Sequence, residues 1–283
     1  MIQFEDFSFR YKSSEAFALQ GISMTIENGA FVGIIGNSGA GKSTLTYTLS
    51  GTIPHHFDGD FYGSVKVNGL DTVEVRPEKL AQFVGEVFQD IDSQMVSSIV
   101  EDEILFGMEN FGVPHDEIGR RLDSVLDMLG IRDLKDRQIS SLSGGQKQKV
   151  AIAAILAMDP EIIVLDEPTG ELDPASSIMI FDTLRRLNRE FGKTVIVVEQ
   201  KIMLLCEYVD RLLVMDAGKI VFDGRSEEIV QQVPLFKNLG INVPRVVELG
   251  QQLTAAGLYH GAIPLDLDQA EKMVKEVLAD AGV

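Results

Sequence analysis

The sequence predicts an α/β fold built around a phosphate-binding loop, with an antiparallel β part, a helical insertion and a small helical C-terminal extension. Residues 31–44, FVGIIGNSGAGKST, have the pattern of a strand, a glycine-rich turn and the start of a helix. Residues 161–165, 194–198 and 211–215 are near-continuous β-branched or aliphatic runs, as in parallel strands covered on both faces. Residues from about 90 to 160 instead repeat apolar side chains at helical spacing.

Length, charge and cysteine content limit the possible classes of protein. The 283 residues have room for one large domain, or for one domain with an appendage. A net charge of −18 disfavours binding to nucleic-acid phosphates or to anionic lipid, so any membrane association is expected to run through a protein partner. The sequence has no apolar run of about 18 residues and no apolar signal region at its N-terminus. The single cysteine, Cys206, lies in an apolar helical run and is expected to be a core residue.

The first 72 residues predict antiparallel strands on either side of the phosphate loop. IQFEDFSF and GISMTIENG alternate apolar and polar residues, and Tyr11 lies at the end of the first of these strands. SVKVNGLDT continues the pattern, with Asn68 and Gly69 as the expected hairpin turn.

The glycine-rich stretch is the G-x-x-x-x-G-K-S pattern of a loop that binds nucleotide phosphates. Its glycines let several backbone N–H groups converge on one anion, and the helix N-terminus adds partial positive charge. Lys42 adds a full positive charge, and the Ser43 hydroxyl is suited to ligate Mg²⁺. An ordinary glycine-rich turn between a strand and a helix is the alternative, and the full motif in this context outweighs it. The predicted contacts to ATP from this loop come from Gly36, Asn37, Ser38, Gly39, Ala40, Gly41, Lys42, Ser43 and Thr44.

The C-terminal part after residue 225 loses the strand pattern. Residues 226–232, 244–256 and 268–278 have the composition of short helices. Asp268 and Glu271 have the spacing of a capping box at the start of the last helix. We therefore expect a main domain at 1–225, with its helical subdomain at about 90–160, and a helical extension at 226–283.

Two adjacent carboxylates end the apolar run IIVLDEP at 162–168. Asp166, at the carboxyl end of the strand, is suited to hold Mg²⁺ directly or through water. Glu167 follows at the edge of the sheet, where its carboxylate is expected to polarise the water that attacks the γ-phosphate. A solvated turn is the alternative for such a pair, but the upstream phosphate loop favours a catalytic role.

A second anion-binding surface is predicted at LSGGQ, residues 142–146. Ser143, Gly144 and Gly145 precede an apolar helix, so a hydroxyl, free N–H groups and the helix dipole meet at one point. Taken alone, this pattern is a plausible helix cap. The two anion sites are separated by a whole helical subdomain, so we expect two chains to associate head to tail, each closing the ATP site of the other.

Together these motifs resemble the nucleotide-binding subunits of ABC transporters, over residues 1 to about 225. The resemblance implies a P-loop NTPase fold with a RecA-like core, an antiparallel β subdomain and an inserted helical subdomain, and it implies a Mg²⁺-dependent ATPase. It places Tyr11 where the family stacks an aromatic ring on adenine, although packing is an equally common role for such a residue. Gln89 matches the glutamine that contacts Mg²⁺ and the attacking water and reports to the membrane partner.

The resemblance also assigns two segments to the contact between ATPase chains. Residues 142–146, with Ser143, Gly144, Gly145 and Gln146, match the signature that binds the ATP of the other chain. Residues 170–173, GELD, match the loop that crosses the dimer interface.

One position departs from the family pattern. Where the family has Thr-His-Asp after the strand at 194–198, this chain has Glu199, Gln200 and Lys201, so Gln200 stands at the switch position that contacts the γ-phosphate. A glutamine amide can donate a hydrogen bond to phosphate but cannot become cationic or shuttle a proton. We therefore expect a site that binds ATP well and hydrolyses it slowly, or that depends on a partner with a complete site.

The segment after Gln89, together with IPHHFDG at 53–59, most resembles the energy-coupling factor (ECF) branch of the family. That resemblance implies a second ATPase chain, held partly by the C-terminal extension. Gln200 favours a non-identical second chain over a second copy, because one site with a His could then sustain turnover. It also implies an integral membrane coupling protein and a substrate-binding membrane subunit, at the cytoplasmic face of the cell membrane. Many such complexes import vitamins or transition-metal ions.

Two alternatives remain open. A soluble ABC ATPase acting on nucleic acid or ribosomes is disfavoured by the acidic charge and by the lack of a long coiled-coil insertion between Lys42 and Ser143. A largely structural ATPase partner, with Gln200 marking an impaired site, is disfavoured because Lys42, Asp166 and Glu167 are all present.

Overall fold

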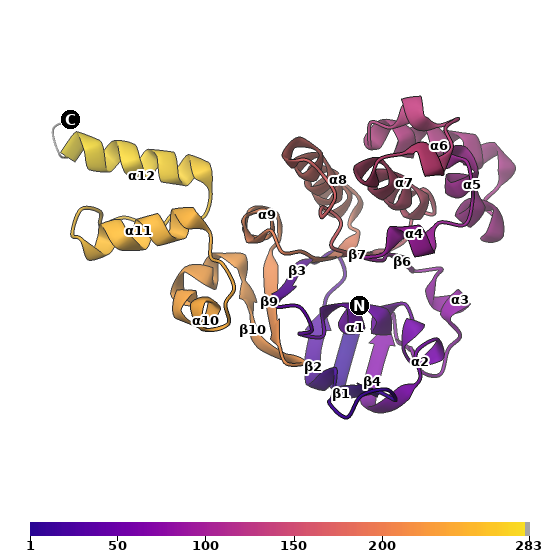
Figure 1. The fold of residues 1–283 in the computed structure, drawn as a ribbon, viewed down its shortest axis with the longest axis horizontal. Coiled ribbons are helices and arrows are strands. Elements are labelled where there is room, and N and C mark those ends of the chain that lie inside the picture. Colours follow the sequence, from indigo (N-terminus) through magenta and orange to yellow (C-terminus); the bar gives the residue numbers. More distant parts are fainter. Residues whose placement is uncertain (281–283) are drawn as a thin grey trace.

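The computed structural model describes residues 1–280, apart from the side chains of 229–231 and 280, and arranges them as two sheets with helices around them (Figure 1). The larger sheet has the strand order β10-β9-β3-β8-β7-β6. Neighbouring strands from β9 to β6 run parallel, whereas β10 pairs with β9 in the antiparallel sense. The strands predicted from the β-branched runs are thereby confirmed. Their bounds are β3 Phe31–Gly36, β6 Val84–Val87, β7 Ile162–Asp166, β8 Thr194–Val198, β9 Arg211–Asp216 and β10 Lys219–Arg225.

The smaller sheet is antiparallel and has the order β2-β1-β4-β5. Asn68 and Gly69, with φ of 50° and 78°, turn the chain between β4 and β5, so the predicted hairpin is confirmed. Both residues lie in the left-handed region that such two-residue turns require. The strands are β1 Ile2–Tyr11, β2 Leu19–Ile26, β4 Gly59–Val67 and β5 Leu70–Asp71.

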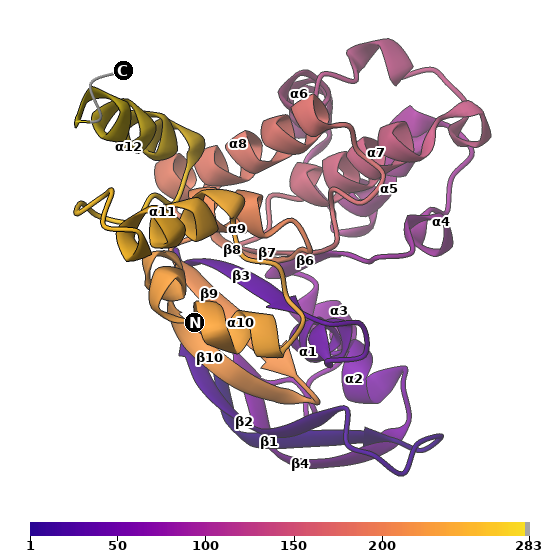
Figure 2. The same ribbon diagram turned by 60° about the vertical axis from the view of Figure 1, so that its left-hand side comes forward.

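Helices cover the large sheet and form a separate lobe beside it (Figure 1, Figure 2). The lobe, expected at about 90–160, is made of the helices between Ile91 and Ala157. Within it, Leu122, Val125 and Leu126 of α6 are buried in the core, as the helical spacing predicts. Neither β6 nor α8 is among the elements predicted from the sequence. The helices are α1 Lys42–Leu49, α2 Thr52–His55, α3 Pro77–Leu80, α4 Ile91–Gln94, α5 Val100–Asn110, α6 His115–Met128, η1 Arg132–Leu134, η2 Ile139–Ser141, α7 Gly144–Ala157, α8 Pro174–Phe191 and α9 Ile202–Tyr208.

Cys206 is buried on α9 within the main core, as expected. Burial raises the pKa of its thiol to about 12, so the reactive thiolate is disfavoured at neutral pH. The side chain therefore serves as a small core residue.

The C-terminal extension begins as a continuation of the main core. Phe236 packs edge-on against Phe222 of β10, with ring centroids 6.2 Å apart, and Ile241 and Val247 belong to the same core cluster. Helices α11 and α12 project away from the sheets as a hairpin (Figure 1, left). None of the helices in residues 1–280 is long and apolar enough to cross a membrane. The extension contains η3 Ser226–Gln231, α10 Val233–Asn238, α11 Arg245–Ala255 and α12 Leu267–Asp280.

The helix predicted at 226–232 is a 3₁₀ helix at Ser226–Gln231, and α10 follows it without having been predicted. The capping box predicted for the last helix is wrong. The last helix begins at Leu267, so Asp268 and Glu271 do not form its capping box. Asp266 takes that place, because its carboxylate accepts a hydrogen bond of 2.7 Å from the backbone N–H of Gln269.

Candidate functional site

Four parallel strands of the large sheet end at one edge, and a candidate residue follows or ends each of them. The phosphate loop follows β3, Gln89 follows β6, Asp166 ends β7 and Gln200 follows β8. The carboxyl edge of an open α/β sheet is where such folds bind their ligands. The sheet topology therefore collects residues from widely separated parts of the sequence.

The phosphate loop is shaped by close backbone approaches. A Cβ at Gly36 would lie 2.3 Å from the carbonyl oxygen of Met215, and one at Gly41 would lie 2.4 Å from that of Ala18. Gly41 also has φ of 99°, which L side chains rarely adopt. Only glycine fits at these two positions, so the motif glycines have a direct steric explanation.

The loop presents donors to an anion. No side chain among residues 1–280 caps the N-terminus of α1, which leaves its first backbone N–H groups for a ligand. Lys42 is largely buried, and its Nζ donates to the carbonyl oxygens of Gly36 at 2.8 Å and Asn37 at 3.0 Å. The ammonium group is thus held directly over the loop, where it can neutralise phosphate charge.

Asp166 has the environment of a cation ligand. It is only 1% exposed, and its Oδ2 has no hydrogen-bond partner among the described residues. Burial raises the pKa of this carboxyl, although a hydrogen bond with the Ser43 hydroxyl opposes the shift. The described residues contain no group of three or more His, Cys, Asp and Glu side chains suited to a metal. A Mg²⁺ ion here would rely on Asp166 and Ser43 with phosphate oxygens and water, which is the usual pattern for this ion.

Glu167 is held between two amides. Its Oε2 accepts a hydrogen bond of 3.1 Å from Nε2 of Gln89, and its Oε1 accepts one of 2.7 Å from Nε2 of Gln200. The backbone of Glu167 has φ of 53°, a left-handed conformation that is costly for a residue with a Cβ and is concentrated at functional sites. The structure therefore unites three predicted site residues in one cluster beside the phosphate loop.

Tyr11 lies in an aromatic group beside α1. Its hydroxyl is 3.1 Å from Oγ1 of Thr44, and its ring meets those of Phe9 and Phe57 edge-on at 4.8 and 5.9 Å. Burial raises the pKa of its phenol, which therefore stays protonated. The ring is half-buried, so it combines packing with a partly accessible surface.

Ser143 caps α7 and is not brought to the phosphate loop of its own chain. Its Oγ accepts from the N–H of Gln146 at 3.3 Å, and its N–H donates to Oε1 of Gln146 at 3.0 Å, which completes a capping box. Helix α7 lies in the helical lobe, on the other side of the sheet edge from α1 in both views (Figure 1, Figure 2). The two predicted anion sites are therefore separate within one chain.

The comparison with protein families agrees with this geometry. The family model described as ABC transporter matches residues 19–170. The chain belongs to the ABC transporter family. It is 40% identical over 282 residues to the energy-coupling factor transporter ATP-binding protein EcfA1 of Caldanaerobacter subterraneus, with 97% of this chain and 98% of that protein covered.

Solved structures of other ABC ATPases have the same fold as this chain. CbiO1 from Clostridium perfringens, described as part of the ABC transporter complex CbiONQ, has a TM-score of 0.72 and 33% identity, covering 88% of this chain and 98% of that chain. The ATP-binding cassette MJ0796 was solved as a dimer bound to ADP and Pi. It has a TM-score of 0.71 and 27% identity, covering 80% of this chain and 99% of that chain. The predicted fold, the ATPase class and the resemblance to the ECF branch are confirmed. The roles of individual site residues stay predictions.

The C-terminal extension of the ABC ATPase touches its phosphate loop, which the sequence did not predict. Nδ2 of Asn37 donates a hydrogen bond of 2.5 Å to the carbonyl oxygen of Leu239, at the end of α10. No local signal could have revealed this contact, because the two residues are 202 positions apart.

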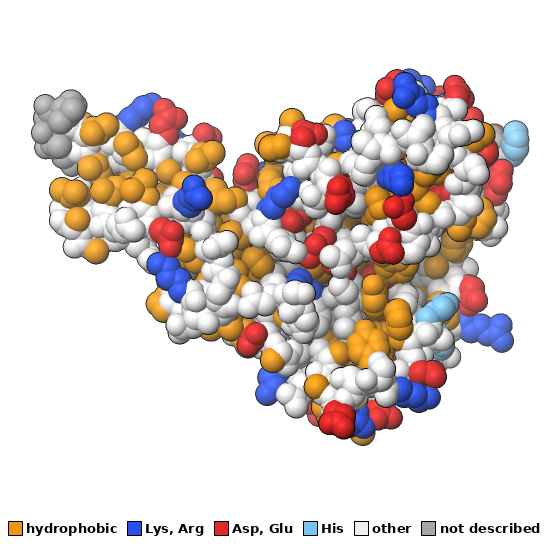
Figure 3. All heavy atoms as spheres, viewed as in Figure 1, with side chains coloured by type: hydrophobic (Ala, Val, Ile, Leu, Met, Phe, Trp, Pro, Cys, Tyr) orange, Lys and Arg blue, Asp and Glu red, His pale blue; other side chains and the backbone are white. Residues whose placement is uncertain are grey.

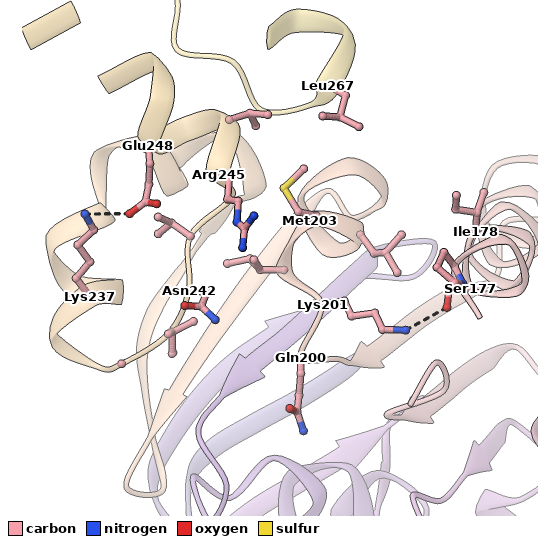
Figure 4. Close-up of a pocket in the computed structure, with 17 residues that line it drawn as sticks. Ser177, Ile178, Gln200, Lys201, Met203, Lys237, Asn242, Arg245, Glu248 and Leu267 are labelled. Carbon is pink, nitrogen blue, oxygen red and sulfur yellow. Dashed lines mark hydrogen bonds and ion pairs between the residues drawn. The ribbon is translucent and has the colours of Figure 1, made fainter. Parts of the chain in front are cut away.

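A groove of about 910 Å³ separates the extension from the switch position (Figure 4). Gln200 and Lys201 line one side, while Asn242, Arg245 and the ion pair between Lys237 and Glu248, 3.0 Å apart, line the other. Lys201 points across to Ser177 on α8 (Figure 4). The extension thus borders the loop that carries Gln200 as well as the phosphate loop.

Proposed function

We propose that this ABC ATPase binds MgATP and uses its hydrolysis to energise a membrane importer of the ECF type, which takes up a vitamin or a transition-metal ion. The fold, the family and the match to EcfA1 along nearly the whole chain support this assignment. The solute itself would be recognised by another polypeptide.

Each predicted site residue has a role in this proposal. Loop amides and Lys42 bind the phosphates, Tyr11 contacts adenine, and Ser43, Asp166 and Gln89 hold Mg²⁺, which when bound neutralises charge on the phosphates. Glu167 accepts hydrogen bonds on both oxygens from Gln89 and Gln200, an arrangement that orients it toward a water molecule. Gln200 then donates to the γ-phosphate.

The separation of the phosphate loop from Ser143 is the observation that carries this proposal. A single chain offers two half-sites, so a second ATPase chain would supply Ser143, Gly144, Gly145 and Gln146 to each bound ATP, as predicted from the resemblance. The dimeric structure reported for MJ0796 is consistent with this arrangement. Because Gln200 cannot carry a proton, we propose that the second chain is a non-identical one with a complete site.

An apolar groove on the helical lobe is proposed as the contact for the membrane coupling protein. It has a volume of about 220 Å³ and lies next to the segment after Gln89. Val96 and Phe106, which both line it, are 63% and 48% exposed, and adjoining apolar surface of this kind commonly marks a protein contact. The chain would then sit at the cytoplasmic face of the membrane, next to the coupling protein and the substrate-binding membrane subunit.

The hairpin of α11 and α12 is proposed to join the two ATPase chains. Hydrophobic side chains gather over these helices (Figure 3). Leu249, Leu258, Val274 and Leu278 are all exposed there. Apolar area of this kind commonly marks a protein–protein contact.

Glu167→Gln tests the catalytic part of the proposal in the purified transporter complex. We expect ATP turnover to fall about 100-fold or more, since a general base is lost, while ATP binding persists. Glu190→Gln is the control, because Glu190 lies on the surface of α8 and pairs only with Arg186 among the described residues. Unchanged turnover in Glu167→Gln would favour the structural-partner alternative.

Purification from detergent-solubilised membranes tests the transport part. Recovery of the chain with a second ATPase and integral membrane proteins supports the importer. Recovery with ribosomes or nucleic acid, and without membrane proteins, would support the soluble alternative instead.

A further inference from the structure

Gln200 lies between two charged residues that both bind the segment after β7. Glu199 is 2% exposed, and its Oε2 accepts a hydrogen bond of 2.5 Å from the hydroxyl of Thr169. Its Oε1 accepts from the backbone N–H groups of Gln200 at 2.8 Å and Lys201 at 3.2 Å. The Glu199 carboxylate therefore fixes the backbone of Gln200 and ties it to Thr169.

Lys201 binds residues on either side of the 170–173 segment. Its Nζ donates to the carbonyl oxygen of Thr169 at 2.8 Å and to Oγ of Ser177 at 3.1 Å (Figure 4). The Ser177 hydroxyl in turn donates to the carbonyl oxygen of Asp173 at 3.0 Å. One ammonium group thus holds the residue before the segment and, through Ser177, the last residue of the segment.

The same segment packs against the start of α7. A Cβ at Gly144 would lie 3.0 Å from Oε2 of Glu171, and one at Gly145 would lie 3.0 Å from the carbonyl oxygen of Glu171. The segment therefore lies between the Ser143 surface and the loop that carries Gln200. Its flanking residues Thr169 and Ser177 are the ones that Glu199 and Lys201 bind.

We propose that Glu199 and Lys201 are positioning residues that keep Gln200 bonded to Glu167 through their hydrogen bonds to Thr169 and Ser177, which flank the 170–173 segment. A neutral amide donates along fixed directions and has no charge to attract it to phosphate from a distance. The Gln200 amide can therefore act on a phosphate only from an accurate position. The charge-assisted hydrogen bonds of Glu199 and Lys201, on either side of Gln200, provide that position. The inference rests on the proposed role of Gln200 in ATP hydrolysis.

Kinetics of the purified transporter complex test the inference, with kcat measured separately from ATP affinity. Lys201→Met should lower kcat about tenfold, which corresponds to one charged hydrogen bond, and change the Kd for ATP less than about twofold. Lys201→Arg should restore most of kcat, because a guanidinium can still donate to both oxygens. Thr169→Val removes the hydroxyl that binds Glu199 and should give a loss in the same direction. Lys79→Met on the exposed surface of α3 is the control.

A double-mutant cycle distinguishes positioning from a general structural effect. If Lys201 acts through Gln200, Lys201→Met should cause no further loss of kcat in the Gln200→Ala background. Equal losses in both backgrounds, or a normal kcat in Lys201→Met and Thr169→Val while Gln200→Ala is slow, would overturn the positioning role alone. A normal kcat in Gln200→Ala would overturn the proposed role of Gln200 together with this inference.

Discussion

The phosphate loop and the loop after β8 follow adjacent strands of one sheet, but they are held in place by different parts of the chain. The phosphate loop is fixed by its backbone, with Gly36 and Gly41 in close contact with neighbouring carbonyl groups. The loop after β8 is fixed by side chains, through the hydrogen bonds of Glu199, Gln200 and Lys201. Where neighbouring backbone comes this close, as at Gly36 and Gly41, no larger residue fits. A loop fixed by side chains can accept another residue type, and this chain has Gln where the family pattern has His.

The largest expected effect tests the backbone-fixed loop. Gly36→Ala should lower the free energy of unfolding by about 3 kcal/mol or more, because its Cβ would meet the carbonyl oxygen of Met215, which cannot rotate away. Thermal unfolding and ATP binding would measure the change.

Gly39→Ala is the matched control for this substitution. Beyond its chain neighbours, no atom of the described residues lies within 4 Å of its Cβ position. Only its φ of 78° therefore opposes the change, at a cost of about 1 kcal/mol. Equal destabilisation by the two variants would contradict the steric explanation.

A smaller effect is expected from Glu86, a buried carboxylate on β6, the strand next to β7. Neither of its oxygens has a hydrogen-bond partner among the described residues, and burial raises its pKa from 4.5 to about 7. The folded state thus binds this proton more tightly than the unfolded state. The stability that protonated Glu86 contributes is complete below about pH 4.5 and is lost as the pH rises through about 7.

Glu86→Gln should remove this pH dependence. Above about pH 8 the variant should be more stable than the wild type by about 3 kcal/mol, and the difference should shrink toward acidic pH. Urea unfolding across this pH range measures it. Parallel pH profiles for the two proteins would show that Glu86 is not responsible.

The smallest expected effect tests the side-chain-fixed loop directly. Gln200→His should raise ATP turnover of the assembled complex, on the order of tenfold, because an imidazole can carry a proton where an amide cannot. Gln200→Asn keeps the amide and should not raise turnover. If Gln200→His left turnover unchanged, the departure from the family pattern would have no kinetic consequence.

The sequence alone determined the features whose signals are local. The strand, turn and helix around Gly36 and Lys42, the hairpin at Asn68 and Gly69, and the cap at Ser143 each depend on residues a few positions apart. A local capping pattern gave the wrong start for the last helix. Two overlapping capping patterns occur there, and the helix begins after Asp266 instead of at Asp268, as the hydrogen bond to Gln269 shows.

Only the tertiary structure decided how the distant parts combine. Gln89 and Gln200 reach Glu167 from 78 and 33 positions away, and Asn37 reaches Leu239 from 202 positions away. Glu199 and Gln200 are adjacent in sequence, yet one side chain is buried on Thr169 and the other reaches Glu167. The physical reason is that local patterns fix backbone conformation, whereas the partner of a side chain depends on which strands the sheet places next to one another.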